Sequence, residues 1–247
     1  MNIDVHFDFT SDSPDYWDHF WDNAGGHGGG NSDPDAASPT LREYHQIFWS
    51  RELPCGRYMK LEQPKDGYLC WDKMYFGSDS ITCSFRYGSF PLLAELEKTP
   101  GYRQIVEDYL HRAYTIGGMI IFPVHRYSMN QARGMHRKIR DRWDWTLECI
   151  RRYYAGESSP LIKVLESDAE FYRLFVDFKG FVEFFLLQDC VTDDGQVCLW
   201  TEGVPFERPA FPQDANEYWK FLQYELEFVE SRNQRIDSIV SGNIHTD

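Results

Sequence analysis

The order of two hydrophobic patterns along the chain is the feature that most constrains its fold. Short stretches rich in aromatic and β-branched residues occur in the first half, including an alternating stretch at 3–9 that predicts a strand. Amphipathic stripes with helical spacing dominate the second half. Since strands and helices do not alternate, a parallel sheet is disfavoured and an α+β fold is predicted.

The predicted fold is a small antiparallel sheet from the N-terminal half, packed on a mainly helical C-terminal half. Its hairpin is predicted from 67–76 and 81–87, with 77–79 as the turn. A short buried strand is predicted at 119–124. Asp214 is predicted to cap a long amphipathic helix near the C-terminus.

The predicted domain organisation is an N-terminal strand and arm at 1–37, followed by a single α+β domain at 38–247. The arm is acidic, and the Gly-rich stretch at 25–30 indicates a flexible loop. This loop is not a phosphate-binding loop, because no Gly-Lys-Ser/Thr sequence ends it.

The composition excludes several classes of protein. Aromatic residues make up 17% of the chain, which is too many for a disordered protein. The formal net charge of −14 disfavours a general binder of nucleic acids or anionic membranes. No apolar run approaches the roughly 20 residues of a membrane helix. The six cysteines show no zinc-ligand spacing, so reduced thiols, a cytoplasmic location and no metal site are predicted.

One basic segment stands out in this acidic chain, and we call residues 126–152 the basic segment. It holds eight Lys and Arg residues and three acidic residues, a net charge of +5. Arginines near the start of a helix, here predicted at about 136–155, favour phosphate or carboxylate groups. The hypothesis is therefore a site for a small anionic ligand, such as a nucleotide or phosphorylated metabolite. Its candidate ligand-binding residues are Arg126, Asn130, Arg133, Arg140, Arg142 and Trp145.

Two carboxylates of the same segment, Asp144 and Glu148, are the candidate catalytic residues, because such groups serve as general acids and bases. In the alternative hypothesis the protein is a non-enzymatic interaction protein. The arginines then form an internal salt-bridge network with Asp177, Glu183 and Asp189. A weaker alternative is a nuclease or nucleic-acid binder. The cofactor, the oligomeric state and whether the protein is an enzyme stay open. His45 is predicted to be a hydrogen-bonded structural histidine.

Several motifs resemble those of one known family. They are 38–45, 49–50, 53–54, 114–119, 122–123, 133–134, 139–142, 146–152, 177–180, 184–189 and 230–236. The family is an uncharacterised bacterial one, a domain of unknown function, and the resemblance extends over most of the chain from about residue 32. It implies a bacterial cytoplasmic protein with one whole-chain domain, and it implies no activity or cofactor.

Overall fold

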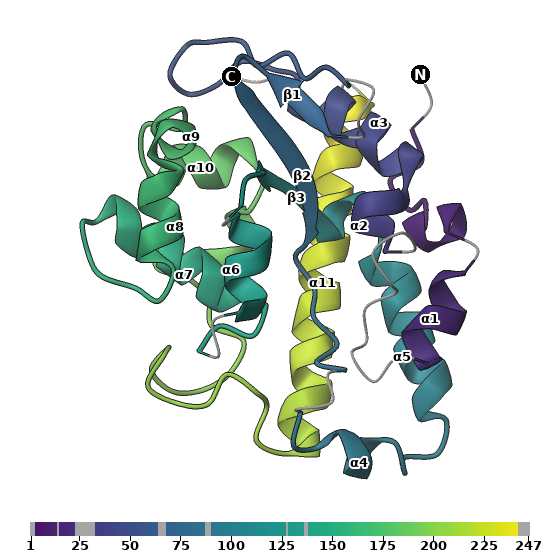
Figure 1. Cartoon of the computed structure of the whole chain (residues 1–247). Helices are drawn as coiled ribbons and strands as arrows, with labels where there is room; N and C mark the ends of the chain where they lie inside the picture. The colour runs from purple at the N-terminus through teal and green to yellow at the C-terminus, as the bar shows by residue number, and fades with distance from the viewer. Residues whose placement is uncertain are drawn as a thin grey trace.

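The computed structural model of the chain shows a small antiparallel sheet lying against helices (Figure 1). It describes residues 3–13, 15–22, 33–63, 68–86, 90–126, 128–135 and 138–241. The helices dominate the C-terminal half, and the strands belong to the N-terminal half. The predicted α+β fold class is confirmed. The division of the chain at residue 37 stays a prediction.

The sheet has the strand order β1 (Leu69–Trp71), β2 (Met74–Ser80) and β3 (Met119–Pro123), with both pairings antiparallel. The pairing of β1 with β2 stops at Leu69, which lies opposite Phe76. Beyond that pair β2 continues to Ser80 along β3 alone. One edge of the second half of β2 therefore has no strand partner among the described residues.

The predicted hairpin turn at 77–79 is wrong, because these residues lie inside β2. The chain instead turns at 72–73, where Asp72 has a positive φ of 56°. A glycine is needed at position 77 for close packing, since a Cβ there would lie 2.7 Å from Val124 Cγ2. The predicted second hairpin strand is also wrong over the described residues 81–86, which are irregular.

The predicted strand at 3–9 is not formed. Residues Phe9–Asp12 form a 3-10 helix, η1, at whose start the Asp8 carboxylate accepts hydrogen bonds from the backbone and hydroxyl of Thr10. Val5 and Phe9 are nevertheless buried in the core. The predicted Gly-rich loop at 25–30 lies outside the described residues.

The helices that follow form the rest of the molecule. They are α1 (Tyr16–Asp22), α2 (Pro34–Ala37), α3 (Pro39–Trp49), α4 (Leu93–Leu96), α5 (Tyr102–Ala113), η2 (Ile116–Gly118), α6 (Met129–Met135), α7 (Trp143–Tyr154), α8 (Ile162–Ser167), α9 (Ala169–Arg173), α10 (Phe178–Phe184), η3 (Gln188–Cys190) and α11 (Ala215–Val240). None of the described helices is long and apolar enough to cross a membrane.

The helix predicted at about 136–155 begins later, at Trp143. Arg140 and Asp141 both have positive φ angles, 51° and 59°, which a continuous helix does not allow. The basic segment is therefore divided between α6, an irregular connection and α7. This break places the arginines of the segment in different surroundings.

The long helix α11 lies behind the sheet and holds it in place (Figure 1). Asp214 caps this helix by accepting from the backbone N–H of Glu217, as predicted. Arg232 is fully buried and donates to the carbonyl oxygens of Gly117 and Met119, just before and at the start of β3. The helix thereby fixes β3, and through β3 the position of β2.

Candidate functional site

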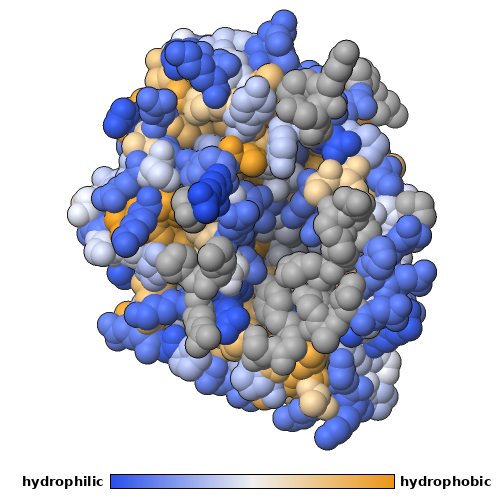
Figure 2. All heavy atoms as spheres, viewed as in Figure 1, coloured by the Kyte–Doolittle hydropathy of each residue, from blue (hydrophilic) through white to orange (hydrophobic). Residues whose placement is uncertain are grey.

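A cavity of about 1030 Å³ lies beside the second half of β2, at the edge where the described residues provide no strand neighbour. Its lining includes residues of α1, α2, α3, α5 and α6, together with β2 and the segment that follows it. Hydrophilic side chains predominate on the face of the molecule shown in Figure 2. The cavity therefore lies beside the part of β2 that does not pair with β1.

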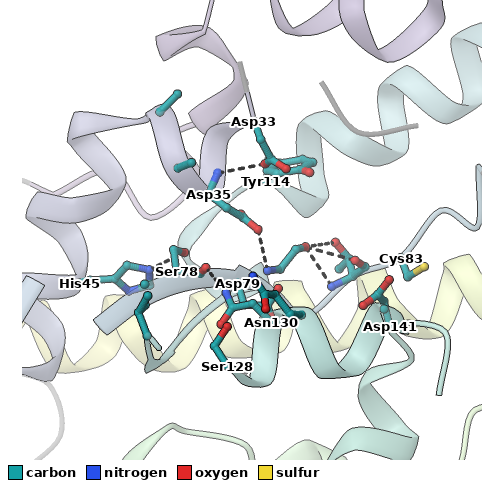
Figure 3. Close-up of a pocket in the computed structure, with 18 of the residues that line it drawn as sticks. Asp33, Asp35, His45, Ser78, Asp79, Cys83, Tyr114, Ser128, Asn130 and Asp141 are labelled. Carbon is teal, nitrogen blue, oxygen red and sulfur yellow. Dashed lines mark hydrogen bonds between the residues drawn. The ribbon is translucent and has the colours of Figure 1, made fainter. Parts of the chain in front are cut away.

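Side chains, rather than a strand, satisfy the open edge of β2. The Asp35 carboxylate accepts from the Ser80 backbone N–H at 3.0 Å. The Asn130 side-chain amide donates to the Ser78 carbonyl oxygen at 2.6 Å. Arg133 donates to the Ser80 carbonyl oxygen at 3.0 Å. These bonds block the addition of another strand at this edge. In Figure 3, Asp35 reaches toward β2 from α2, while Asn130 lies along the strand.

Arg133 lies behind the wall of the cavity and is fully buried. Besides Ser80, it donates to the Asp79 carboxylate, to the Asp141 carbonyl oxygen at 2.6 Å and to the Thr146 hydroxyl at 3.0 Å. Its charge is thus balanced by Asp79, a residue that does line the cavity. Arg133 can position Asp79, but it does not present an open guanidinium face to a ligand.

Two oxygen atoms in the cavity wall lack a hydrogen-bond partner within the part of the chain that the structure describes. They are Asp35 Oδ1 and Asn130 Oδ1, and both atoms are buried. Buried polar atoms are nearly always hydrogen-bonded, and an unmet one costs about 1–3 kcal/mol. Asn130 Oδ1 is an acceptor, and Asp35 Oδ1 is one when its carboxyl is ionised. A ligand that satisfies both oxygens in that state has to supply hydrogen-bond donors. The lining also holds a buried donor without a described partner, Arg42 Nε.

The cavity wall carries more aspartates than arginines. Its acidic residues are Asp33, Asp35, Asp79 and Asp141, its arginines are Arg42 and Arg86, and two histidines, His45 and His125, also line it. Burial raises the pKa of Asp35 well above its ordinary value, and the neighbouring Asp33 and Asp79 raise it further. Burial also raises the pKa of Asp79 to about 6, although Arg133 opposes the shift. Asp35 therefore holds a proton more readily than an exposed carboxyl does.

His45 is buried on α3 and contacts the cavity through Ser78. Trp49 donates its indole N–H to His45 Nδ1 at 2.9 Å, and His45 Nε2 lies 2.9 Å from Ser78 Oγ. Burial lowers the pKa of His45 to about 3, and nearby Arg232 adds to the effect. The prediction of a hydrogen-bonded structural histidine is confirmed.

Among the candidate ligand-binding and catalytic residues, Asn130 lines the cavity, whereas the others do not belong to its lining. Arg142 is fully buried and donates to both oxygens of Asp144, to the Ala210 carbonyl oxygen and to the Thr201 hydroxyl. Trp145 is buried as well, with the Arg142 guanidinium 4.3 Å from its ring centroid. This group forms a closed internal network away from the cavity.

Glu148 lies on α7 and accepts from Arg151 and Arg152, each at 2.7 Å. Burial raises the pKa of Glu148, but these hydrogen bonds outweigh it, and the net shift is downward. Such a carboxylate stays ionised and paired. Arg126 is exposed, and the Arg140 guanidinium lies 4.8 Å from the ring centroid of Phe211.

For Arg133, Arg142 and Arg151 the predicted salt-bridge partners are wrong. Asp177 instead caps α10, Glu183 pairs with Lys179, and Asp189 pairs with Arg235. The partners that the structure provides for Arg133, Arg142 and Arg151 are Asp79, Asp144 and Glu148. Two of these three acids come from the basic segment itself.

Asp35, Ser78 and Asp79 are cavity residues that were not predicted as site residues. The available signal was the polar run 78–80 next to apolar Phe76, because polar residues inside a short strand need partners. As for metals, no group of three His, Cys, Asp or Glu side chains suited to an ion occurs among the residues that the structure describes.

The fold and the site together define an α+β protein with an acidic cavity at a sheet edge closed by side chains. The chain belongs to a family of unknown function, DUF6994, whose model matches residues 3–236. The family resemblance seen in the sequence is thus confirmed. No curated protein and no solved structure matches the chain. Function therefore has to be argued from the cavity itself.

Proposed function

We propose that the protein binds a small organic cation in the cavity beside β2. The observation that carries this proposal is the pair of buried, unpartnered acceptors, Asp35 Oδ1 and Asn130 Oδ1, in the wall of one cavity. An ammonium group supplies several donors and no acceptor, so it complements the ionised Asp35 carboxylate, while Asn130 Oδ1 is left for a second donor of the ligand.

The charge of the cavity favours a cation over a neutral donor. The acids that line it outnumber the arginines, and the chain as a whole carries a net charge of −14. Charges interact more strongly in a partly buried cavity than in water. An ammonium beside Asp35 and Asp79 would stabilise their ionised forms and lower their raised pKa values. Binding is therefore expected to release protons.

The hypothesis of an anionic ligand at the basic segment stays a prediction, and the geometry supports it less. Arg133 and Arg142 are fully buried and each has a carboxylate partner. An anion would have to compete with Asp79 and Asp144 for these guanidinium groups. The alternatives of an interaction protein and of a nuclease or nucleic-acid binder also stay predictions.

A matched series of ligands tests the sign of the charge. D-glucosamine, D-glucose and D-glucose 6-phosphate share a ring and differ in charge, so calorimetric titration of each isolates the electrostatic contribution. We expect only the protonated amine to bind. Asp35→Asn should weaken binding by about tenfold or more, since one charge-assisted hydrogen bond is lost.

Asp237→Asn is the matched control, because Asp237 is an exposed carboxylate on α11 outside the cavity lining. This variant should bind the amine as the wild type does. Binding of the phosphate without the amine would overturn the proposal and support the anion hypothesis. No binding of the amine at millimolar concentrations would overturn it as well.

The bacterial origin and the cytoplasmic location are likewise proposed. All six cysteines are free in the structure, which supports residence in a reducing compartment. Quantitation of free thiols in freshly isolated, unfolded protein tests this, and we expect six reactive thiols. A disulfide in the isolated protein would contradict it.

A further inference from the structure

A directed chain of hydrogen bonds runs from the core to the cavity through Trp49, His45 and Ser78. An indole N–H can only donate, so His45 Nδ1 has to accept. The neutral imidazole then carries its one proton on Nε2, which donates to Ser78 Oγ. Trp49 thus fixes the tautomer of His45 and the role of the Ser78 oxygen.

The Ser78 hydroxyl is left as a donor. Its oxygen accepts from His45, so its own proton needs an acceptor elsewhere, and the described residues show none for it. Ser78 lines the cavity, and Figure 3 shows it between His45 and Asp79. A nucleophilic serine needs a neighbouring base that accepts its proton, and this tautomer of His45 cannot do so. Ser78 is therefore suited to binding and not to attack.

Asn130 lies beside Ser78 and offers a hydrogen-bond acceptor, whereas Ser78 offers a donor. Its Nδ2 donates to the Ser78 carbonyl oxygen at 2.6 Å, and this fixes which end of the amide is the oxygen. The fixed Oδ1 is the buried acceptor without a described partner. A donor and an acceptor thus come from neighbouring side chains of β2 and α6.

We infer that the ligand of the proposed cation site carries a hydroxyl group that bonds to Ser78 and Asn130, so that its class is the amino alcohols and amino sugars. A hydroxyl both donates and accepts, as this pair requires. The inference rests on the proposed function, because the ammonium group is assigned to the acidic wall at Asp35 and Asp79.

Cyclohexylammonium is the probe that separates the two parts of the ligand. It shares a six-membered ring and an amine with D-glucosamine but has no hydroxyl. We expect D-glucosamine to bind about tenfold more tightly, the size of effect that one or two net hydrogen bonds produce. Ser78→Ala should weaken D-glucosamine binding by a similar factor and leave cyclohexylammonium unchanged.

Ser78→Thr keeps the hydroxyl and should retain the preference for D-glucosamine. Ser167→Ala is the matched control, since the Ser167 hydroxyl donates to the Val164 carbonyl oxygen within α8 and Ser167 is not part of the cavity lining. Equal binding of both amines, each dependent on Asp35, would overturn the hydroxyl inference and leave the cation site standing. Failure of both amines to bind would overturn both.

The tautomer of His45 can be measured without any variant. Nitrogen-15 NMR of the imidazole should show a protonated Nε2 and an unprotonated Nδ1. This pattern should persist from neutral pH down to about 5, because burial lowers the pKa of His45 to about 3. A proton on Nδ1 would overturn the inference, since Ser78 would then donate to His45 and not to a ligand.

Discussion

Two buried polar regions of this protein differ in how completely their hydrogen bonds are formed. In the network of Arg142 and Asp144 both side chains are fully buried, and the carboxylate is bonded by the guanidinium and by the Trp200 backbone N–H. In the cavity, Asp35 Oδ1 and Asn130 Oδ1 have no partner among the described residues.

This difference distinguishes charged residues that stabilise the core from charged residues that are available to bind a ligand. A network whose members satisfy one another rigidifies the core, and its residues are not available to a ligand. A wall that leaves acceptors unmet carries an energetic cost in the free protein that a ligand can relieve. We therefore assign a structural role to the Arg142 network and a binding role to the cavity.

The largest expected effect is that of Arg142→Met, which leaves the Asp144 carboxylate buried without its cation. Breaking one partner of a buried pair costs about 3–5 kcal/mol in the free energy of unfolding. Urea denaturation measures this loss, with Arg103→Met as the control. Arg103 pairs with Glu107 at the surface, so its loss should cost about 1 kcal/mol or less. Similar losses in both variants would remove the distinction between the two regions.

The next effect is a dependence of stability on pH that comes from the cavity. The pKa of Asp79 is about 6 in the folded protein and ordinarily 3.8, so the folded state keeps a proton that the unfolded chain releases. The contribution of Asp79 to stability is therefore greatest below the lower value and declines as pH rises through about 6. Denaturation across this range should show a smaller decline for Asp79→Asn than for the wild type. If wild type and Asp79→Asn lost stability equally with rising pH, the raised pKa of Asp79 would be contradicted.

A smaller effect, of opposite sign to the usual one, is expected at Asp35. The pKa of its buried carboxyl is raised, and one carboxylate oxygen has no described hydrogen-bond partner. Asp35→Asn should therefore raise the melting temperature of the free protein at pH 8 by a few degrees. The same substitution should weaken amine binding. Calorimetry in the absence of ligand gives the comparison. A lower melting temperature would indicate that Asp35 is structural.

The smallest effect is expected for Glu148→Gln. Glu148 is buried, but its partners Arg151 and Arg152 are partly exposed and Gln keeps one acceptor oxygen, so about 1 kcal/mol of stability should be lost. Titration with D-glucosamine should be unchanged. A large loss of binding would instead indicate that Glu148 is a functional residue of the basic segment.

The sequence predicts those parts of the fold that depend on local pattern. The cap at Asp214 and the long helix after it follow from spacing within a few residues, and both are present. The turn at 77–79 was misplaced because Gly-Ser-Asp is also typical of turns. Only the packing of Gly77 against Val124 shows why a glycine stands there.

The cavity depends on contacts that no local pattern contains. Asp35, Ser78 and Asn130 lie far apart in the chain and meet along the part of β2 that does not pair with β1. Asn130 is among the candidate ligand-binding residues of the basic segment, but the sequence predicts an anionic ligand there. Net charge along a segment shows which charges are present, but the pairing of Arg133 with Asp79 required the tertiary fold.

The most direct test of the cavity as a cation site is the proton balance of binding. Calorimetric titration with D-glucosamine in two buffers of different ionisation enthalpy measures it at about pH 6, close to the raised pKa of Asp79, where the amine is charged. The cation should release protons from the acidic wall, and Asp35→Asn should release fewer. Proton uptake, or binding with no exchange in either protein, would contradict a cation held by Asp35 and Asp79.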